Sequence, residues 1–287
     1  METAKTAETL DGDKLYQMRA RIALPILVRQ AIAHRPITYS DLAEEIGMEN
    51  PRNLNYVLGS IGETLIELQA KWGIEIPLIN CLVINKNTGL PGEGIDGFIG
   101  SGNEFKNLPK RKQRILIDEI AKGVFKFDRW SEVLSALGLE QVKPIDYPEL
   151  IKQSNSRFGE GSGESEFHKK LKEFVSKSIQ ILDLPKDTSR GIAEYLLPSG
   201  DVVDVMFITK TDWVAVEVKS RISNLEDIRR GLYQCIKYEA VVEALHSEMG
   251  LLPSCRAVLV LESEFPLELK PLKNLLGVEV IDNVQVG

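Results

Sequence analysis

Two valine-rich segments in the C-terminal half constrain the fold of this chain more than any other feature. Residues 201–208 and 213–220 both have the composition of β-strands, and only the short turn 209–212 separates them. When the first and last turn residues pair, the segments form an antiparallel hairpin in which Asp204 lies directly opposite Glu217. The valines that surround these two acids predict a sheet that is covered on both faces.

The predicted hairpin brings three charged side chains together. Cross-strand neighbours have Cβ atoms about 5 Å apart, so Asp204 and Glu217 are close enough to share one divalent cation. Side chains alternate along a strand, and Lys219 therefore points to the same face as Glu217. Two carboxylates on an apolar hairpin are destabilising unless a metal ion or Lys219 offsets their charge. The alternative is a surface hairpin on which water solvates both acids and Lys219 pairs with one of them.

The order of these residues along the chain resembles the motif order of a known nuclease superfamily. An acidic helix start, Asp204, the triplet Glu217-Val-Lys219 and a following amphipathic helix are similar to the PD-(D/E)xK nucleases over roughly residues 160–285. On that helix, Gln234-Cys-Ile-Lys-Tyr238 resembles the QxxxY motif of the RecB-like branch. Val203 stands where the superfamily often has proline, a variation that is tolerated because the proline has no chemical role.

The resemblance implies a metal site. Asp204 and Glu217 would bind Mg²⁺ or Mn²⁺, assisted by the main-chain carbonyl of Val218. A glutamate of the first helix would complete the metal shell, and both Glu166 and Glu164 qualify. These two lie on different faces of the helix, so only one can point inward. We favour Glu166, because it lies closer to the body of the helix.

The resemblance also implies roles for neighbouring residues. Lys219 would position or activate the attacking water and stabilise the charge that develops in the transition state. Gln234 and Tyr238 share one helix face and would orient the metal site or the scissile strand, or else form a polar stripe at the sheet edge. We expect His168 to contact phosphate or lie on the helix face, and Glu194 to be an exposed strand residue rather than an outer-shell acid.

Basic side chains in the same half predict a local nucleic-acid contact. The formal net charge of −7 argues against a protein that coats nucleic acid, but it does not exclude a local basic track. The predicted track consists of Lys169, Lys170 and Lys172 on the first helix together with Arg221, Arg229, Arg230 and Lys237.

The N-terminal half has the helix pattern of a winged helix-turn-helix. Residues 14–34 predict a helix that Pro25 kinks or breaks, and residues 38–47 predict a short capped helix. A third helix follows Asn50-Pro51, where asparagine can cap and proline fits the first helical position. The apolar run 79–84 and the glycine-rich turn after it would supply the wing.

The third helix of this half would be the reading helix. Its first turn offers Arg52, Asn53 and Asn55, which are residue types suited to phosphates and base edges. The alternative is a helical dimerisation or docking domain whose polar face is merely solvated. We expect the basic run 110–114 to be a solvated helix face, with phosphate contact as the alternative.

A polar, glycine-rich segment marks the domain boundary, because residues 153–163 have no periodicity. We predict a winged helix-turn-helix-like DNA- or partner-binding domain at 14–150, a flexible linker at 151–163 and a nuclease domain at 164–287. The predicted fold class is an α/β, restriction-endonuclease-like C-terminal domain, with a mixed central sheet flanked by helices, after a mainly α-helical N-terminal domain.

Composition excludes several classes of protein. A hydrophobic fraction of 43% and a charged fraction of 27% are typical of globular proteins. No apolar stretch approaches the ~20 residues that cross a bilayer, and the N-terminus lacks the order of a signal peptide, so we expect a cytoplasmic protein. Cys81, Cys235 and Cys255 lie far apart, which supports neither a disulfide framework nor a cysteine zinc site.

These observations predict a Mg²⁺-dependent endonuclease that hydrolyses phosphodiester bonds of DNA. The resemblance suggests restriction or anti-phage defence, with a second copy of the chain or another defence protein as a partner. One alternative is a non-cleaving DNA-binding regulator or assembly subunit that retains a nuclease fold. A protein that does not cleave has no need of all three of Asp204, Glu217 and Lys219, so their presence argues against this alternative. The other is a structure-selective or RNA-directed nuclease.

Overall fold

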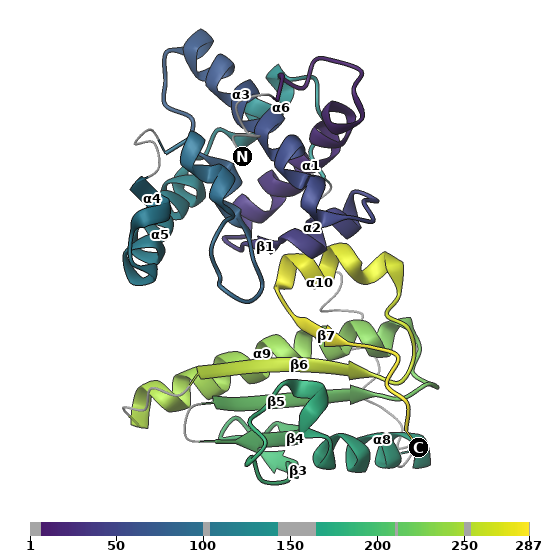
Figure 1. Ribbon diagram of the computed structural model, residues 1–287. Coiled ribbons are helices and arrows are strands. Elements are labelled where there is room, and N and C mark those ends of the chain that lie inside the picture. Colours follow the sequence, from purple (N-terminus) through teal and green to yellow (C-terminus); the bar gives the residue numbers. More distant parts are fainter. Residues whose placement is uncertain (1–6, 100–103, 143–164, 210–211, 250–253, 287) are drawn as a thin grey trace. The chain divides into compact units, whose positions relative to one another are not determined.

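The computed structural model describes residues 7–99, 104–142, 165–209, 212–249 and 254–286 (Figure 1). The chain divides into two compact units, residues 1–144 and 145–287, which we call the N-terminal and C-terminal units. The predicted linker at 151–163 and the alternative ligand Glu164 lie outside the described residues.

The C-terminal unit contains a five-stranded mixed sheet in the order β3-β4-β5-β6-β7 (Figure 1). The first three strands form an antiparallel meander, and β6 and β7 then run parallel to β5. The strands are β3 (Ile192–Leu196), β4 (Val202–Ile208), β5 (Asp212–Lys219), β6 (Ser254–Leu261) and β7 (Glu279–Ile281). The expectation of a mixed α/β domain is therefore confirmed at this level.

The register of β4 and β5 agrees with the predicted hairpin. Val205 pairs with Val216, and the same register continues to the turn, where the Thr209 amide donates to the Asp212 carbonyl at 2.8 Å. The paired ladder ends at Val205. If the same register continued past Val205, Asp204 would lie opposite Glu217. At this point the Val218 amide of β5 donates a hydrogen bond to the Asp204 carboxylate, and main-chain pairing stops.

Helices cover both faces of this sheet, as the valine-rich strands predict. On one face, α8 (Glu166–Lys177) packs Leu171 and Val175 against the valines of β4, β5 and β6. On the other face, α9 (Leu225–Met249) packs Leu232 and Val242 against the sheet, and α10 (Lys270–Leu276) joins the same core (Figure 1).

The N-terminal unit is mainly helical. Its helices are α1 (Leu15–Ile32), α2 (Tyr39–Glu45), α3 (Leu54–Trp72), α4 (Glu104–Asn107), α5 (Lys110–Lys126) and α6 (Trp130–Ala136). The two predicted N-caps are confirmed, because Thr38 Oγ1 accepts from the Asp41 amide and Asn50 Oδ1 accepts from the Arg52 amide. The apolar residues of α3 recur at helical spacing and pack into the core of the unit.

One local prediction for this unit is wrong, and another is wrong in part. Of the kink or break predicted at Pro25, the break does not occur: α1 continues to Ile32, because the residues around Pro25 are buried and held by packing on several sides. The run 79–84 is not a wing strand. Its first four residues form the 3₁₀-helix η3 (Ile79–Leu82), and only β2 (Val83–Ile84) pairs, in parallel, with β1 (Ile37–Thr38).

The reason for the second difference is burial. All four residues of η3 are buried, whereas a strand at the surface would expose every second side chain. No helix within the described ranges is both long enough and apolar enough to cross a membrane.

Gly231 of α9 sets the distance between that helix and the sheet, which we can test by adding one methyl group. A Cβ at this position would lie 2.7 Å from Leu259 Cδ1 and 3.0 Å from Lys219 Cε. We expect Gly231→Ala to lower the free energy of unfolding by about 1–3 kcal/mol, because the buried Leu259 side chain or α9 itself must shift to make room for the methyl group. Urea denaturation of the full chain measures this change.

The matched control is Gly123→Ala in α5, where an added Cβ meets no atom within 4 Å. This substitution should be neutral or stabilise by about 0.5–1 kcal/mol, because alanine favours a helix interior more than glycine does. Equal effects of the two substitutions would contradict close packing at Gly231.

Candidate active site

The centre of the candidate site is the carboxylate of Glu217, near the end of β5. Glu217 is only 3% exposed, although glutamate is normally a surface residue. Its Oε1 lies 2.6 Å from Lys219 Nζ, and its Oε2 lies 3.1 Å from the Tyr238 hydroxyl of α9. Both carboxylate oxygens therefore have a hydrogen-bond donor.

Asp204 of β4 lies beside this group and joins two other elements. Its Oδ2 accepts from the Val218 amide of β5 at 2.9 Å, and its Oδ1 lies 3.2 Å from His168 Nε2 of α8. The side chain is 16% exposed, so it is partly open to solvent. The carboxylate of Asp204 thus connects α8 to the central strand.

Gln234 and Tyr238 complete the contacts from α9. Gln234 Oε1 accepts from Lys219 Nζ at 3.2 Å, and Gln234 Nε2 donates to the Tyr238 hydroxyl at 3.2 Å. The Tyr238 hydroxyl also lies 3.0 Å from the Val202 carbonyl. The structure therefore brings together five residues that the sequence predicts as one site: Asp204, Glu217, Lys219, Gln234 and Tyr238.

The two carboxylates differ in their electrostatic environment. Burial raises the pKa of Glu217, and the nearby charge of Asp204 raises it further, in opposition to Lys219 and Tyr238. Burial also acts to raise the pKa of Asp204, but the hydrogen bonds from His168 and Val218 outweigh it and hold that pKa below its usual value. Negative charge is thus stabilised at Asp204 and destabilised at Glu217, where a bound cation would relieve it.

The donor set fits a hard divalent cation. Mg²⁺ is commonly bound through one or two carboxylates and keeps several water ligands. Asp204 and Glu217 supply two carboxylates whose charges influence each other. In the part of the chain that the structure describes, no group of three or more His, Cys, Asp or Glu side chains could hold a metal ion. Two carboxylates would leave the remaining coordination positions of such a cation to water.

The helix glutamate predicted as a metal ligand lies elsewhere. The side chain of Glu166 is 86% exposed and its carboxylate is 3.7 Å from Lys170 Nζ on the same helix. His168 is the residue of α8 that contacts Asp204. The sequence contains a signal for this choice, because His168 lies at helical spacing from the buried Leu171 and Val175, whereas Glu166 does not.

Glu194 is an exposed residue of β3, as the sequence predicts, with a side chain that is 64% exposed. The pairs Ala193–Val205 and Tyr195–Val203 flank it in β3, so it occupies the position opposite Asp204. Its φ of 54° is left-handed, and its carboxylate lies 2.9 Å from Lys172 Nζ. The Leu197 amide donates to the Asp201 carbonyl across the turn between β3 and β4. Counting back from this pair places Glu194 opposite Asp204, so the turn is the sequence signal for the alignment.

The residues of the predicted basic track are mostly paired with acids. Ion pairs join Lys170 to Glu166, Arg229 to Glu226, Arg230 to Asp227, Lys237 to Asp201 and Arg221 to Glu262. Lys172 is buried and contacts Glu194, while Lys169 is exposed. Arg221 also stacks over the ring of Phe167, at 4.2 Å from its centroid. These cations would reach a phosphate only in competition with their acidic neighbours.

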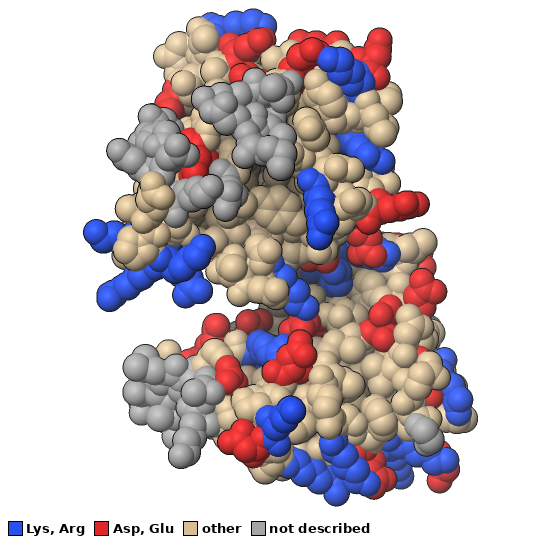
Figure 2. Space-filling view, in the orientation of Figure 1, with Lys and Arg blue, Asp and Glu red and all other residues tan. Residues whose placement is uncertain are grey.

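The predicted contacts of the N-terminal unit separate into two groups. Arg52 and Asn55 line one pocket, whereas Asn53 lines a different hollow beside Tyr56. The basic side chains in the run 110–114 are exposed, and Lys and Arg side chains gather over α5 (Figure 2). Comparisons with protein-family models, with curated proteins and with solved structures found no match to this chain.

The contact between His168 and Asp204 predicts a measurable pKa change. We expect His168→Ala to raise the pKa of Asp204, because the variant loses one of the hydrogen bonds that favour the charged form. Carboxyl-carbon NMR of the metal-free protein as a function of pH measures it. Lys170→Ala is the matched control on the same helix, since Lys170 contacts Glu166 and not Asp204.

The same substitution should lower stability near neutral pH. A carboxylate whose folded-state pKa is depressed stabilises the fold above its unfolded pKa, and this contribution disappears as the pH falls through the folded value. The stability difference between wild type and His168→Ala should therefore shrink in acid. A difference that stays constant with pH would show that the contact has no electrostatic role.

Proposed function

We propose that the C-terminal unit is a Mg²⁺- or Mn²⁺-dependent nuclease that hydrolyses phosphodiester bonds of DNA, with a restriction-endonuclease-like fold. The observation that carries this proposal is the contact set around Lys219. Its ammonium lies 2.6 Å from Glu217 Oε1 and 3.2 Å from Gln234 Oε1, next to the strand that carries Asp204. A surface hairpin would not explain a buried Glu217 with both oxygens bonded.

Each residue has a distinct task in this proposal. Asp204 and Glu217 would hold the metal ion, with the Val218 carbonyl as a further ligand. A bound Mg²⁺ supplies Lewis acidity at the phosphate and a water of lowered pKa. Lys219 would hold the attacking water and stabilise the negative charge that develops on the phosphate oxygens.

Gln234 and Tyr238 are positioning residues. Gln234 accepts a hydrogen bond from Lys219 and so fixes the direction of the ammonium group. The Tyr238 hydroxyl lies next to Glu217 Oε2 and leaves Oε1 to Lys219. His168 would hold Asp204 in the orientation in which its carboxylate faces the site.

The N-terminal unit would bind the nucleic acid as a winged-helix-like module. The support for this role is the order of α2, the short capped turn η2 (Pro51–Asn53) and α3, with Arg52 in the turn that precedes α3. Arg52 is exposed, so its guanidinium can reach a phosphate. The parallel pairing of β1 and β2 departs from the usual antiparallel wing.

Isosteric variants of the two carboxylates test the metal-dependent chemistry. Asp204→Asn and Glu217→Gln should reduce Mg²⁺-dependent cleavage of plasmid DNA by at least about 10²-fold, because each removes a charged metal ligand. Mg²⁺ should raise the melting temperature of wild type, since ligand at 100 times its Kd adds about 2.7 kcal/mol. Neither variant should show this rise.

Asp201→Asn is the control for this test, because Asp201 begins the same hairpin but pairs with Lys237. It should cleave and respond to Mg²⁺ like wild type. Wild-type cleavage by Asp204→Asn would refute the assignment. DNA binding by wild type without cleavage would favour a non-cleaving regulator, and cleavage of RNA alone would favour the RNA-directed alternative.

A substitution of Lys219 separates chemistry from binding. Lys219→Met keeps an apolar stem against Gly231 but removes the ammonium group. We expect the single-turnover cleavage rate to fall by about 10²–10³-fold while the affinity for uncleaved DNA in Ca²⁺ changes little. An equal loss of rate and affinity would make Lys219 a docking residue.

A further inference from the structure

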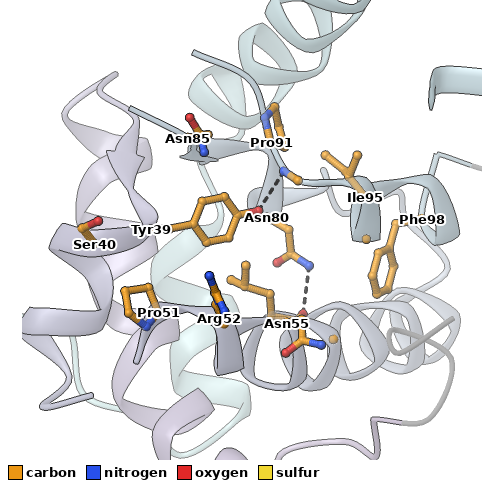
Figure 3. Close-up of a pocket in the computed structure, with 14 residues that line it drawn as sticks. Tyr39, Ser40, Pro51, Arg52, Asn55, Asn80, Asn85, Pro91, Ile95 and Phe98 are labelled. Carbon is orange, nitrogen blue, oxygen red and sulfur yellow. Dashed lines mark hydrogen bonds between the residues drawn. The ribbon is translucent and has the colours of Figure 1, made fainter. Parts of the chain in front are cut away.

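The N-terminal unit contains a pocket of about 410 Å³ that the nuclease proposal does not use (Figure 3). Its volume lies in the range of roughly 300–1,000 Å³ that small-molecule sites occupy. The start of α2, the start of α3, η3 and the loop that contains η4 (Glu93–Gly97) all contribute to its walls. These segments lie far apart in the sequence, so the fold assembles the pocket.

Two amide oxygens in this pocket have no hydrogen-bond partner. Asn80 is only 5% exposed; its Nδ2 donates to the Leu58 carbonyl at 2.9 Å, but its Oδ1 is buried and unpaired in the described structure. The Oδ1 of Asn55 is likewise buried and unpaired there. Both side chains line the pocket (Figure 3). Buried polar atoms are normally bonded to protein or to ordered water, so these two acceptors have capacity for an N–H or O–H donor.

The rest of the lining adds donors and apolar surface. The Tyr39 hydroxyl accepts from the Gly92 amide at 2.9 Å, and burial raises the pKa of Tyr39, so the hydroxyl keeps its own proton to donate. Arg52 adds a cation. Ile95 and the ring of Phe98 supply apolar surface on the other side of the pocket from Tyr39 (Figure 3).

We propose that this pocket binds a nucleobase that carries an exocyclic amino group. Such a base has flat apolar faces for the aromatic walls, amino hydrogens for the two unpaired amide oxygens, and ring acceptors for Tyr39 and Arg52. The base can come from a free nucleoside or from a nucleic-acid strand, which would have to turn it out of its stack. The site lies at the start of α3, where the sequence predicts nucleic-acid contact.

The cysteine next to Asn80 does not supply this pocket with a reactive nucleophile. The nearby Cys81 is the one nucleophile that the sequence places beside Asn80. Its thiol is buried, which raises its pKa to about 12 and makes it unreactive. The proposal goes beyond the nuclease function and uses none of the residues assigned to cleavage, although Arg52 also belongs to the proposed nucleic-acid contact.

The first experiment measures binding to wild-type full-length protein by calorimetry in EDTA, so that no cleavage occurs. The probes are adenosine, purine riboside, which lacks the amino group, and single-stranded oligothymidylates with one central adenosine or one abasic site. We expect adenosine, or the strand that contains it, to bind at least about tenfold more tightly than its matched analogue. Binding of adenosine alone identifies a free nucleoside as the source, and binding of the strand alone identifies nucleic acid.

The second experiment uses one substitution at two neighbouring positions. Asn55→Leu should weaken adenine binding at least about tenfold and leave the melting temperature equal or higher, because it removes an acceptor that the fold does not satisfy. Asn53→Leu, which faces a different hollow, should leave the binding of free adenosine unchanged. Failure of every probe to bind, or an equal loss in both variants, would overturn the proposal. Because EDTA and separate residues are used, a negative cleavage assay has no bearing on this outcome.

Discussion

The buried carboxylate of Glu217 is the constraint on which the rest of the C-terminal unit depends. A charge that is 3% exposed in a central strand is strongly destabilising unless its neighbours compensate it. Lys219 offers the compensating charge and Tyr238 offers a hydrogen bond, and both must approach from the face that α9 covers. The close packing of α9 at Gly231 and the Gln234 contact to Lys219 follow from this requirement.

The sequence was sufficient to predict the hairpin and the side chains that it aligns. A short turn fixes how the two strands that it joins pair. The register of β4 with β5 could therefore be calculated from the turn residues. The spacing of Gln234 and Tyr238 likewise placed both on one face of α9. Local rules are reliable here because the contacts are between neighbours in the chain or across a single turn.

Other contacts depend on tertiary packing, which local rules do not describe. The rotation of α8 places His168, and not Glu166, beside Asp204, because the buried Leu171 and Val175 fix which face meets the sheet. The left-handed φ of Glu194 has no local signal, since residues other than glycine rarely adopt it.

In the N-terminal unit, too, tertiary packing determines features that local sequence rules do not describe. The run 79–84 is apolar throughout and has no period that distinguishes a strand from a buried 3₁₀ turn. The pocket depends on Tyr39, Asn55, Asn80 and Phe98, which come from four separate segments. Only an assembled fold reveals that the amide oxygens of two of these residues are buried without partners.

The hydroxyl group of Tyr238 has one hydrogen and two acceptors within reach. Burial raises the pKa of Tyr238, so the hydrogen is retained, and it can serve either Glu217 Oε2 at 3.1 Å or the Val202 carbonyl at 3.0 Å. While Glu217 is negative, the carboxylate is the stronger acceptor. Neutralising that charge would turn the hydrogen toward Val202 and tie the start of β4 to α9. The direction of the Tyr238 O–H bond would thus depend on the charge of Glu217, and so would the hydrogen bond between α9 and the start of β4.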